Sequence, residues 1–263
     1  MMIVEQMLKN AQTPLLHIAD VSGSALFNAD CMDILPLIPN KSVQLILADL
    51  PYGTTANKWD SVLDLNKLWV EYERILKPKG NIVLFGAGMF AFKLALSNEK
   101  LFRYDMVWKK SKCGSPFTAK YMPLKKHEMI LVFGESASYY LPQLTEGEPY
   151  KRKWTPNKQN NMKYGIKGVQ TDNKGTRHPI TVLDYPQQWR RQDQKHPTQK
   201  PLDLIKWLIT AYSEENEYVL DNTMGSGTTC LGAKELNRRF IGIEKETEYY
   251  NIAVDDVVGS HYR

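Results

Sequence analysis

Long apolar runs, signal sequences and internal repeats are missing from this 263-residue chain. No apolar run approaches the ~18 residues that a membrane-spanning helix needs. The first twelve residues lack the basic segment and apolar core of a signal peptide. We therefore expect a cytoplasmic protein without a membrane partner.

Cysteine is scarce. Cys31, Cys113 and Cys230 are far apart, odd in number and form no CxxC pair. This argues against a disulfide framework and against a zinc site, so no metal is expected. Small buried thiols in a reducing compartment explain the three residues better.

Acidic residues are rare in one segment of the chain. Residues 150–200 hold twelve Lys or Arg against three acids, while the whole chain has a net charge of only +5. A local basic block is the usual footprint of a polyanionic partner such as nucleic acid. A solvated basic loop without a partner is the alternative.

Apolar strands alternate with helical patterns along most of the chain. Residues 43–48 and 81–85 are nearly continuous apolar runs, as expected of buried parallel strands, and residues 63–76 have helical spacing. The alternation predicts an α/β fold with a largely parallel sheet. From 134 to 196 the pattern is lost for about sixty residues, which indicates a functional insertion. Further strands are expected at 25–30, 103–109, 127–133, 217–220 and 239–243, and further helices at 32–38, 89–97, 201–212 and 226–236.

The most informative stretch follows the strand at 217–220. Asp221 ends that strand, and Gly225 and Gly227 break the turn before a helix. Glycines allow a sharp turn and close approach of a ligand, to which the helix start presents free N–H groups. The next strand ends in Glu244, where a Rossmann-type site binds ribose hydroxyls. Since only one strand–helix unit follows the loop, the rest of the sheet must come from upstream.

Asp49-Leu50-Pro51-Tyr52 follows the buried strand at 43–48. Open α/β sheets bind ligands at the carboxyl ends of their strands. The Asp49 carboxylate and the Leu50 carbonyl can each accept a hydrogen bond from an amino group, and Tyr52 can stack on a ring. The tetrapeptide thus suits a planar nitrogen-bearing substrate, although a strand-end turn with a surface tyrosine fits it too.

Four motifs together resemble those of the β-class of S-adenosylmethionine-dependent DNA amino-methyltransferases. The D-P-P-Y tetrapeptide of that family is similar to residues 49–52, and its D-P-F-M-G-S-G-T-T loop to residues 221–229. Its K-H-P-T-Q-K-P string occurs unchanged at 195–201, and its F-I-G-I-E strand end at 240–244. The resemblance covers roughly residues 25–253, in the order catalytic motif before cofactor motif.

The resemblance implies a Rossmann-like, mostly parallel sheet with one antiparallel strand, a circularly permuted motif order and a target-recognition insertion. It divides the chain into a catalytic half at 1–133, the insertion at 134–193 and a cofactor-binding half at 194–263. The implied reaction moves a methyl group from S-adenosylmethionine to the N6 amino group of an adenine flipped out of double-stranded DNA. The aspartate form of the tetrapeptide favours adenine, and N4 of cytosine is the alternative.

By the same resemblance, Asp49, Leu50, Pro51 and Tyr52 are catalytic, without a metal or a covalent intermediate. From the residues alone, Glu244 also fits a surface strand end, Asp30 a helix cap and His196 a structural loop histidine. The residues that the resemblance assigns to the cofactor are Asp30, His196, Thr198, Gln199, Lys200, Asp221, Thr223, Met224, Gly225, Ser226, Gly227, Thr228, Thr229 and Glu244.

Basic residues in and beside the insertion are the candidates for DNA contacts, because phosphate binding by Lys and Arg dominates affinity. Trp154 and Trp189 are more typical of packing. The candidates for phosphate contacts are Lys109, Lys110, Lys112, Lys151, Arg152, Lys153, Lys158, Arg177, Arg190 and Arg191.

Two departures from the family pattern affect the site. Leu50 replaces a proline but keeps the carbonyl, and Asn222-Thr223 replaces Pro-Phe beside the cofactor. Methyltransferases of RNA or protein glutamine usually carry the glycine loop before the tetrapeptide, and a nicotinamide dehydrogenase carries it near its start. A catalytically inactive DNA-binding relative is the remaining alternative.

The resemblance also suggests partners beyond DNA. Relatives of this class often form homodimers, and a cognate restriction endonuclease is a further candidate partner. The expected location is the bacterial cytosol or nucleoid, with a phage origin left open.

Overall fold

The computed structural model describes residues 3–11, 17–19, 23–53, 63–114, 116–154, 169–186 and 199–259. They fall into two compact units, a main unit of Met1–Leu141 with Thr181–Arg263 and a small unit of Pro142–Ile180. The elements of the main unit are α1 (Ile3–Asn10), β1 (His17–Ala19), β2 (Ala25–Asn28), α2 (Cys31–Ile34), η1 (Leu35–Leu37), β3 (Val43–Ala48), α3 (Leu65–Ile75), β4 (Leu76–Gly86), α4 (Met89–Ser97), β5 (Phe102–Lys109), η2 (Pro116–Thr118), β6 (His127–Gly134), β11 (Val182–Asp184), α6 (Leu202–Tyr212), β12 (Tyr218–Asp221), α7 (Thr228–Glu235), β13 (Arg239–Glu244) and α8 (Thr247–Val257).

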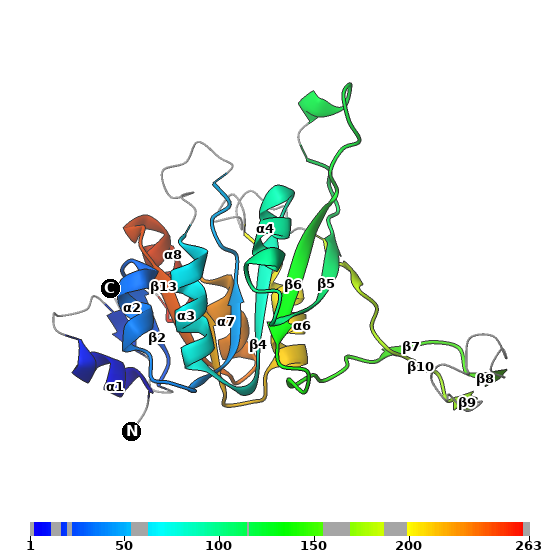
Figure 1. Ribbon diagram of the computed structural model, residues 1–263, viewed down its shortest axis with the longest axis horizontal. Coiled ribbons are helices and arrows are strands. Elements are labelled where there is room, and N and C mark those ends of the chain that lie inside the picture. The colour runs from blue at the N-terminus through cyan, green and yellow to red at the C-terminus, as the bar shows by residue number, and fades with distance from the viewer. Residues whose placement is uncertain are drawn as a thin grey trace. The chain divides into compact units, whose positions relative to one another are not determined.

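The main unit is built on one mixed sheet with helices beside it (Figure 1). The strand order among the described residues is β1-β2-β13-β12-β3-β4-β6-β5-β11. Strands β2 to β4 in this order are parallel, and β6 runs antiparallel between β4 and β5. The α/β class, the mostly parallel sheet and the permuted order are therefore confirmed. The short edge strand β1, which the sequence pattern did not predict, also runs antiparallel to its neighbour.

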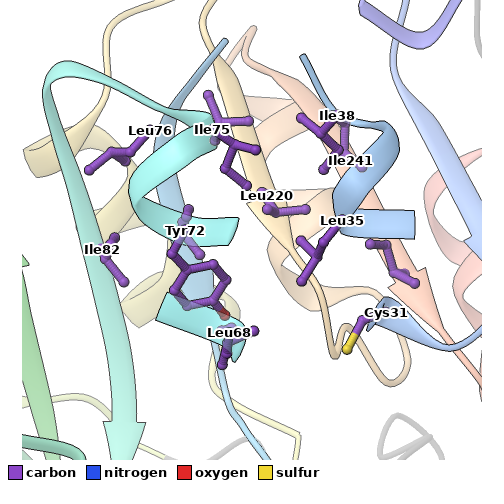
Figure 2. Packing of buried hydrophobic residues seen from close by; sticks show 14 of the residues in the cluster. Cys31, Leu35, Ile38, Leu68, Tyr72, Ile75, Leu76, Ile82, Leu220 and Ile241 are labelled. Carbon is purple, nitrogen blue, oxygen red and sulfur yellow. The ribbon is translucent and has the colours of Figure 1, made fainter. Parts of the chain in front are cut away.

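Both faces of the sheet are covered by helices, because alternate side chains of each central strand enter two separate cores. In β3, Ile46 packs with α2, α3 and α4, whereas Leu45 and Leu47 pack with α6, α7 and α8. Figure 2 shows Tyr72 and Ile75 of α3 and Leu35 of η1 gathered around Leu220 of β12. The continuous apolar runs in the sequence thus reflect burial on both faces.

One expected helix is shorter than its apolar spacing suggested. The pattern predicted a helix over residues 32–38, but α2 ends at Ile34 and continues as the 3₁₀ turn η1 over Leu35–Leu37. Pro36 lies in the first turn of η1 and has no N–H to donate to the helical ladder. The helix therefore changes from α to 3₁₀ geometry at this point. This leaves α2 as a single turn, and its N-terminal end lies at the site described below.

The chain reverses its direction of winding between β12 and β3. From β12 it proceeds through α7 to β13, whereas from β3 it proceeds through α3 to β4 on the other side. β12 and β3 are hydrogen-bonded neighbours and run parallel. In open α/β sheets the crevice at such a switch point, beyond the carboxyl ends of the strands, is where ligands bind.

The small unit consists of two antiparallel pairs, β7 (Thr145–Glu146) with β10 (Thr176–Arg177) and β8 (Tyr150–Trp154) with β9 (Val169–Asn173). It lies within the stretch expected as an insertion at 134–193. At the C-terminal side of this unit, β11 pairs in parallel with β5 and so belongs to the main sheet. Among the described residues, no helix is both long and apolar enough to cross a membrane.

Candidate active site

The site lies at the switch point, where Asp49 follows β3 and Asp221 ends β12. A cavity of about 220 Å³ opens here. All four residues of the tetrapeptide line it, together with most of the residues predicted to contact a cofactor. The described lining residues are Ala29, Asp30, Cys31, Asp49, Leu50, Pro51, Tyr52, Leu63, Phe85, Glu128, Gln199, Lys200, Ile205, Asp221, Asn222, Thr223, Met224, Gly225, Ser226, Thr228, Thr229, Ile243, Glu244, Lys245 and Tyr249.

The tetrapeptide is held from both ends. The Tyr52 hydroxyl donates a hydrogen bond of 2.6 Å to Oδ1 of Asp49, and the Tyr52 ring stacks on Phe90 of α4 with ring centroids 4.8 Å apart. The Leu50 side chain is buried, so it anchors the turn that a proline would otherwise stiffen. The ring and the carboxylate therefore keep a fixed mutual position at the cavity wall.

A buried lysine faces the second oxygen of Asp49. The Lys200 ammonium pairs with Oδ2 of Asp49 and lies 3.4 Å from Oε2 of Glu128. Burial alone lowers the pKa of Lys200, but the carboxylates of Asp49 and Glu128 outweigh it and raise that pKa above its usual value. Lys200, which was predicted to contact the cofactor, lines the cavity and directs its ammonium at Asp49.

The loop after β12 fastens the two halves of the site together. The Thr223 hydroxyl donates to the main-chain carbonyl of Asp49 at 3.2 Å. The neighbouring Asn222 accepts a 2.5 Å hydrogen bond from the buried Tyr72 hydroxyl of α3. These are the two positions where the chain departs from the Pro-Phe of its relatives, and here both side chains serve as structural ties.

Glu244, at the end of β13, is bound to the glycine loop. Its Oε2 accepts a hydrogen bond of 3.0 Å from the Gly225 amide, and its Oε1 accepts one of 2.8 Å from the Glu246 amide. Burial raises the pKa of Glu244, although these amides oppose the shift. Each carboxylate oxygen keeps a further lone pair, so the group can still accept hydrogen bonds from two hydroxyls.

Gly227, which was predicted to contact the cofactor, packs against α8. It takes a left-handed conformation with φ 81°, but it does not line the cavity. A side chain there would meet Cβ of Ala253 on α8 at 2.8 Å. Glycine is thus needed at position 227 for the packing of α8 against the loop, whereas Gly225 faces the cavity with φ 53°.

Asp221 is a buried acid on the floor of the cavity. Its Oδ1 accepts a hydrogen bond of 3.1 Å from the Thr223 amide. Burial raises the pKa of Asp221 to about 7, against the lowering effect of hydrogen bonds from Thr229 and Thr223. The charge of this group therefore changes near neutral pH.

Two predicted cofactor residues lie at the ends of helices. Asp30 accepts a hydrogen bond of 2.9 Å from the Met32 amide and caps α2, and it also lines the cavity, so the cap does not remove it from the site. Gln199 donates to the Thr228 hydroxyl at 3.2 Å, which joins it to the start of α7. His196 and Thr198 lie outside the described residues.

The predicted DNA-binding residues differ in their availability. Lys109 pairs with Asp184 at 2.5 Å, and Lys110 pairs with Glu128. The Arg177 guanidinium stacks over the Tyr150 ring at 4.8 Å and fastens its own turn. Lys112, Lys151, Arg152 and Lys153 are exposed, whereas Lys158, Arg190 and Arg191 lie outside the described part of the chain.

Sequence reasoning missed several lining residues, above all Glu128 and Phe85. Glu128 lies near the start of β6 and Phe85 near the end of β4, and the two strands are antiparallel neighbours. Because β6 runs against the sheet, its first residues reach the same edge as the last residues of the parallel strands. The polar residue opening an otherwise apolar run at 127–134 was the available signal.

The charges of the lining residues suit a cationic ligand. Among the lining residues that the structure describes, carboxylates outnumber ammonium groups, and only Lys200 and Lys245 are basic. A sulfonium group would be attracted electrostatically to such a surface, and Glu244 has acceptors for ribose hydroxyls. The residues present therefore fit the predicted cofactor. The acidic lining residues are Asp30, Asp49, Glu128, Asp221 and Glu244.

Comparison with known proteins gives a consistent result. The family model described as DNA methylase, of the N6/N4 methyltransferase type, matches residues 43–255. Type II methyltransferase M2.LlaDCHI of Lactococcus lactis subsp. cremoris is 28% identical over 264 residues, which cover 88% of each chain. Type II methyltransferase M2.DpnII of Streptococcus pneumoniae is 26% identical and covers 87% of each chain.

Solved structures share the fold at lower identity. The M1.HpyAVI–SAM complex superposes with a TM-score of 0.61 at 23% identity, covering 88% of this chain and 97% of that one. The cytosine-N4-specific PvuII DNA methyltransferase gives a TM-score of 0.62 at 17% identity, covering 91% and 88%. These likenesses establish the architecture of the main unit.

Proposed function

Because this chain belongs to the N6/N4 DNA methylase family, we propose that it transfers a methyl group from S-adenosylmethionine to the N6 amino group of adenine in DNA. One observation carries this proposal. The Asp49 carboxylate, the Tyr52 ring and the Glu244–Gly225 pair line a single cavity, although they come from opposite ends of the chain. That cavity would hold the target base and the cofactor side by side.

Asp49 and Leu50 would act on the target amine. An exocyclic amino group is a poor nucleophile because its lone pair is delocalised into the ring. A carboxylate and a main-chain carbonyl that accept its two protons draw the nitrogen toward a tetrahedral form with a localised lone pair. Both acceptors lie on the rigid turn after β3, so orientation supplies most of the rate enhancement.

The remaining residues would bind and position. The Tyr52 ring would replace the stacking that the flipped base loses, worth about 1–3 kcal/mol. Glu244 would accept the ribose hydroxyls, and the Gly225 turn would approach the methionine part. When bound, S-adenosylmethionine would supply an electrophilic methyl group, which the amine would take by in-line displacement of a neutral thioether. Asp49 would accept the proton that the methylated nitrogen then gives up.

DNA phosphates would be bound by two basic segments, one in the β5–β6 hairpin of the main unit and one in β8 of the small unit, each considered by itself. The hairpin between β5 and β6 extends past the edge of the sheet that carries the site (Figure 1). Residues 109–126 hold six lysines and no acid, and Phe117 and Tyr121 are exposed near its tip. Exposed lysines here and on β8 are suited to phosphates, because phosphate contacts need positive charge rather than a fixed sequence.

Incubation of the purified protein with radiolabelled S-adenosylmethionine and unmethylated genomic DNA tests the proposal. Label in N6-methyladenine with wild type, and none with D49A, would support the reaction, the base and the acid together. Label in N4-methylcytosine would replace adenine by cytosine as the target. Absence of label, with both cofactor and DNA bound, would assign this chain to the inactive members of the family.

Wider partners follow from the same proposal. Gel filtration with light scattering would test the expected homodimer. Restriction-site protection of host DNA would test whether the chain acts beside a cognate endonuclease in a bacterial cytosol.

A further inference from the structure

A chain of four alternating charges leads from the β5–β6 hairpin to the catalytic carboxylate. Lys110 pairs with Oε1 of Glu128, Glu128 faces Lys200, and Lys200 pairs with Asp49. Glu128 and Lys200 have exposed side-chain fractions of only 13% and 9%. The Lys200 ammonium lies 4.9 Å from the centre of the Phe85 ring, which shields it from solvent. The two positive and two negative charges cancel, so each buried charged group depends on its neighbours for charge compensation.

We infer that Glu128 is a positioning residue, which holds the Lys200 ammonium and through it the Asp49 carboxylate in place for methyl transfer. The inference rests on the proposed function. It concerns a residue that lies in none of the motifs shared with the family.

The geometry around Asp49 makes a second carboxylate necessary. Asp49 already accepts from Tyr52 on Oδ1 and from Lys200 on Oδ2. It must also accept a hydrogen bond from the target amine. With Asp49 as its sole partner, the buried ammonium would bind that carboxylate tightly and compete with the amine. Glu128 takes a share of the positive charge, which leaves Asp49 a stronger acceptor for the substrate.

An unused acceptor on Glu128 fits this role. Within the described part of the chain, Oε2 of Glu128 is buried and receives no well-aligned hydrogen bond, although Lys200 Nζ lies 3.4 Å away. A small movement of the ammonium toward Oε2 would form that bond. Lys200 can thus turn toward Glu128 when Asp49 turns toward the amine, without leaving a buried charge unpaired.

The test is E128Q, which keeps the shape of the side chain and removes its charge. We expect kcat for DNA methylation to fall about tenfold or more, as for a misplaced catalytic group. The Kd for S-adenosylmethionine should stay within about twofold of wild type, since Glu128 lies on the Asp49 side of the cavity. E128D, which keeps the charge on a shorter side chain, should recover part of the activity.

Two comparisons separate positioning from a merely structural role. In a K200M background, E128Q should change kcat by about twofold or less, because Glu128 acts through Lys200. E217Q is the matched control, since Glu217 also pairs with a lysine, Lys77, at 2.5 Å but lies outside the described cavity lining. Its kcat should match that of wild type.

Each outcome decides. Equal kcat for E128Q and wild type, or independent effects of E128Q and K200M, would overturn the role of Glu128 and leave the proposed function standing. A different result would show a structural role instead. In that case E128Q would lose kcat, cofactor affinity and thermal stability together, and E128D would restore none of the three. Lack of methyl transfer by wild type in the same assay would overturn the proposed function and this role with it.

Discussion

The Thr223 hydroxyl donates a hydrogen bond of 3.2 Å to the main-chain carbonyl of Asp49, across 174 residues of sequence. The loop that follows β12 thereby fixes the turn that follows β3. The tie therefore restrains the turn of the tetrapeptide, in which Leu50 stands where the family pattern has its first proline.

Removal of this hydroxyl should affect catalysis more than binding. T223V keeps the shape of the side chain but frees the Asp49 carbonyl, so the acid is held less firmly. Because small displacements of catalytic groups are costly, we expect kcat to fall about tenfold with little change in cofactor Kd. Steady-state methylation and calorimetric titration of T223V measure the two quantities. An unchanged kcat would show that the rest of the turn suffices.

Tyr52 combines two functions that substitutions can separate. Y52F keeps the ring stacked on Phe90 and loses only the hydroxyl bonded to Asp49, whereas Y52A loses both. Y52A should weaken binding of the flipped base by about 1–3 kcal/mol, and Y52F should lower kcat by a smaller factor. Fluorescence of 2-aminopurine at the target position reports flipping directly. Equal flipping by Y52A and wild type would refute the stacking role.

Glu244 should determine cofactor affinity. E244Q keeps one acceptor oxygen but loses the charge, and hydrogen bonds to charged groups are worth about 1.5–3 kcal/mol. We expect the Kd of S-adenosylmethionine to rise about 10- to 100-fold. Isothermal titration calorimetry measures it, with E248Q as control because Glu248 is exposed on α8 and lies outside the described cavity lining. Similar affinities for both variants would contradict ribose binding by Glu244.

The buried Asp221 should make stability depend on pH. Its pKa is about 7 in the folded protein against 3.8 for an ordinary aspartate, so folding favours the protonated form. Its contribution to stability is therefore full below pH 3.8 and is lost as the pH rises through 7. The side chain introduced by D221N stays neutral at every pH. Between pH 4 and pH 9, the free energy of unfolding of D221N should therefore rise by up to about 4 kcal/mol relative to that of wild type.

Urea unfolding at several pH values measures this difference. Parallel curves for D221N and wild type would show that Asp221 ionises at its ordinary pKa. The sign of the difference in the free energy of unfolding also matters. If wild type became more stable than D221N as the pH rose, the charged carboxylate of Asp221 would be stabilised in the folded protein.

Gly242 should be sensitive to the smallest enlargement. A Cβ at this position in β13 would lie 2.4 Å from Sδ of Met224 and 2.6 Å from Sγ of Cys230. G242A should therefore destabilise the protein by about 1–3 kcal/mol through overpacking beneath the glycine loop. G114A is the matched control, since its Cβ would meet only the Lys125 carbonyl at 3.5 Å. Thermal unfolding of the two variants should differ clearly in midpoint.

The sequence by itself determined the class of fold and the place of the site. Strands buried on both faces show as apolar runs, and a strand end followed by an acid or a glycine turn is a local feature. Asp49, Tyr52, Gly225 and Glu244 were found in this way, and all four line the cavity. Local pattern sufficed because each of these residues has its position set by its own strand or turn.

Only the tertiary structure decided which partners these residues have. The Lys200 ammonium pairs with the Asp49 carboxylate, and Glu128 reaches the site because β6 runs antiparallel beside β4. The space around Gly227 is set by Ala253 on the later helix α8, a contact that the residues beside Gly227 in the sequence do not predict. Pairings of this kind depend on the register and direction of strands far apart in the chain, which local pattern does not encode.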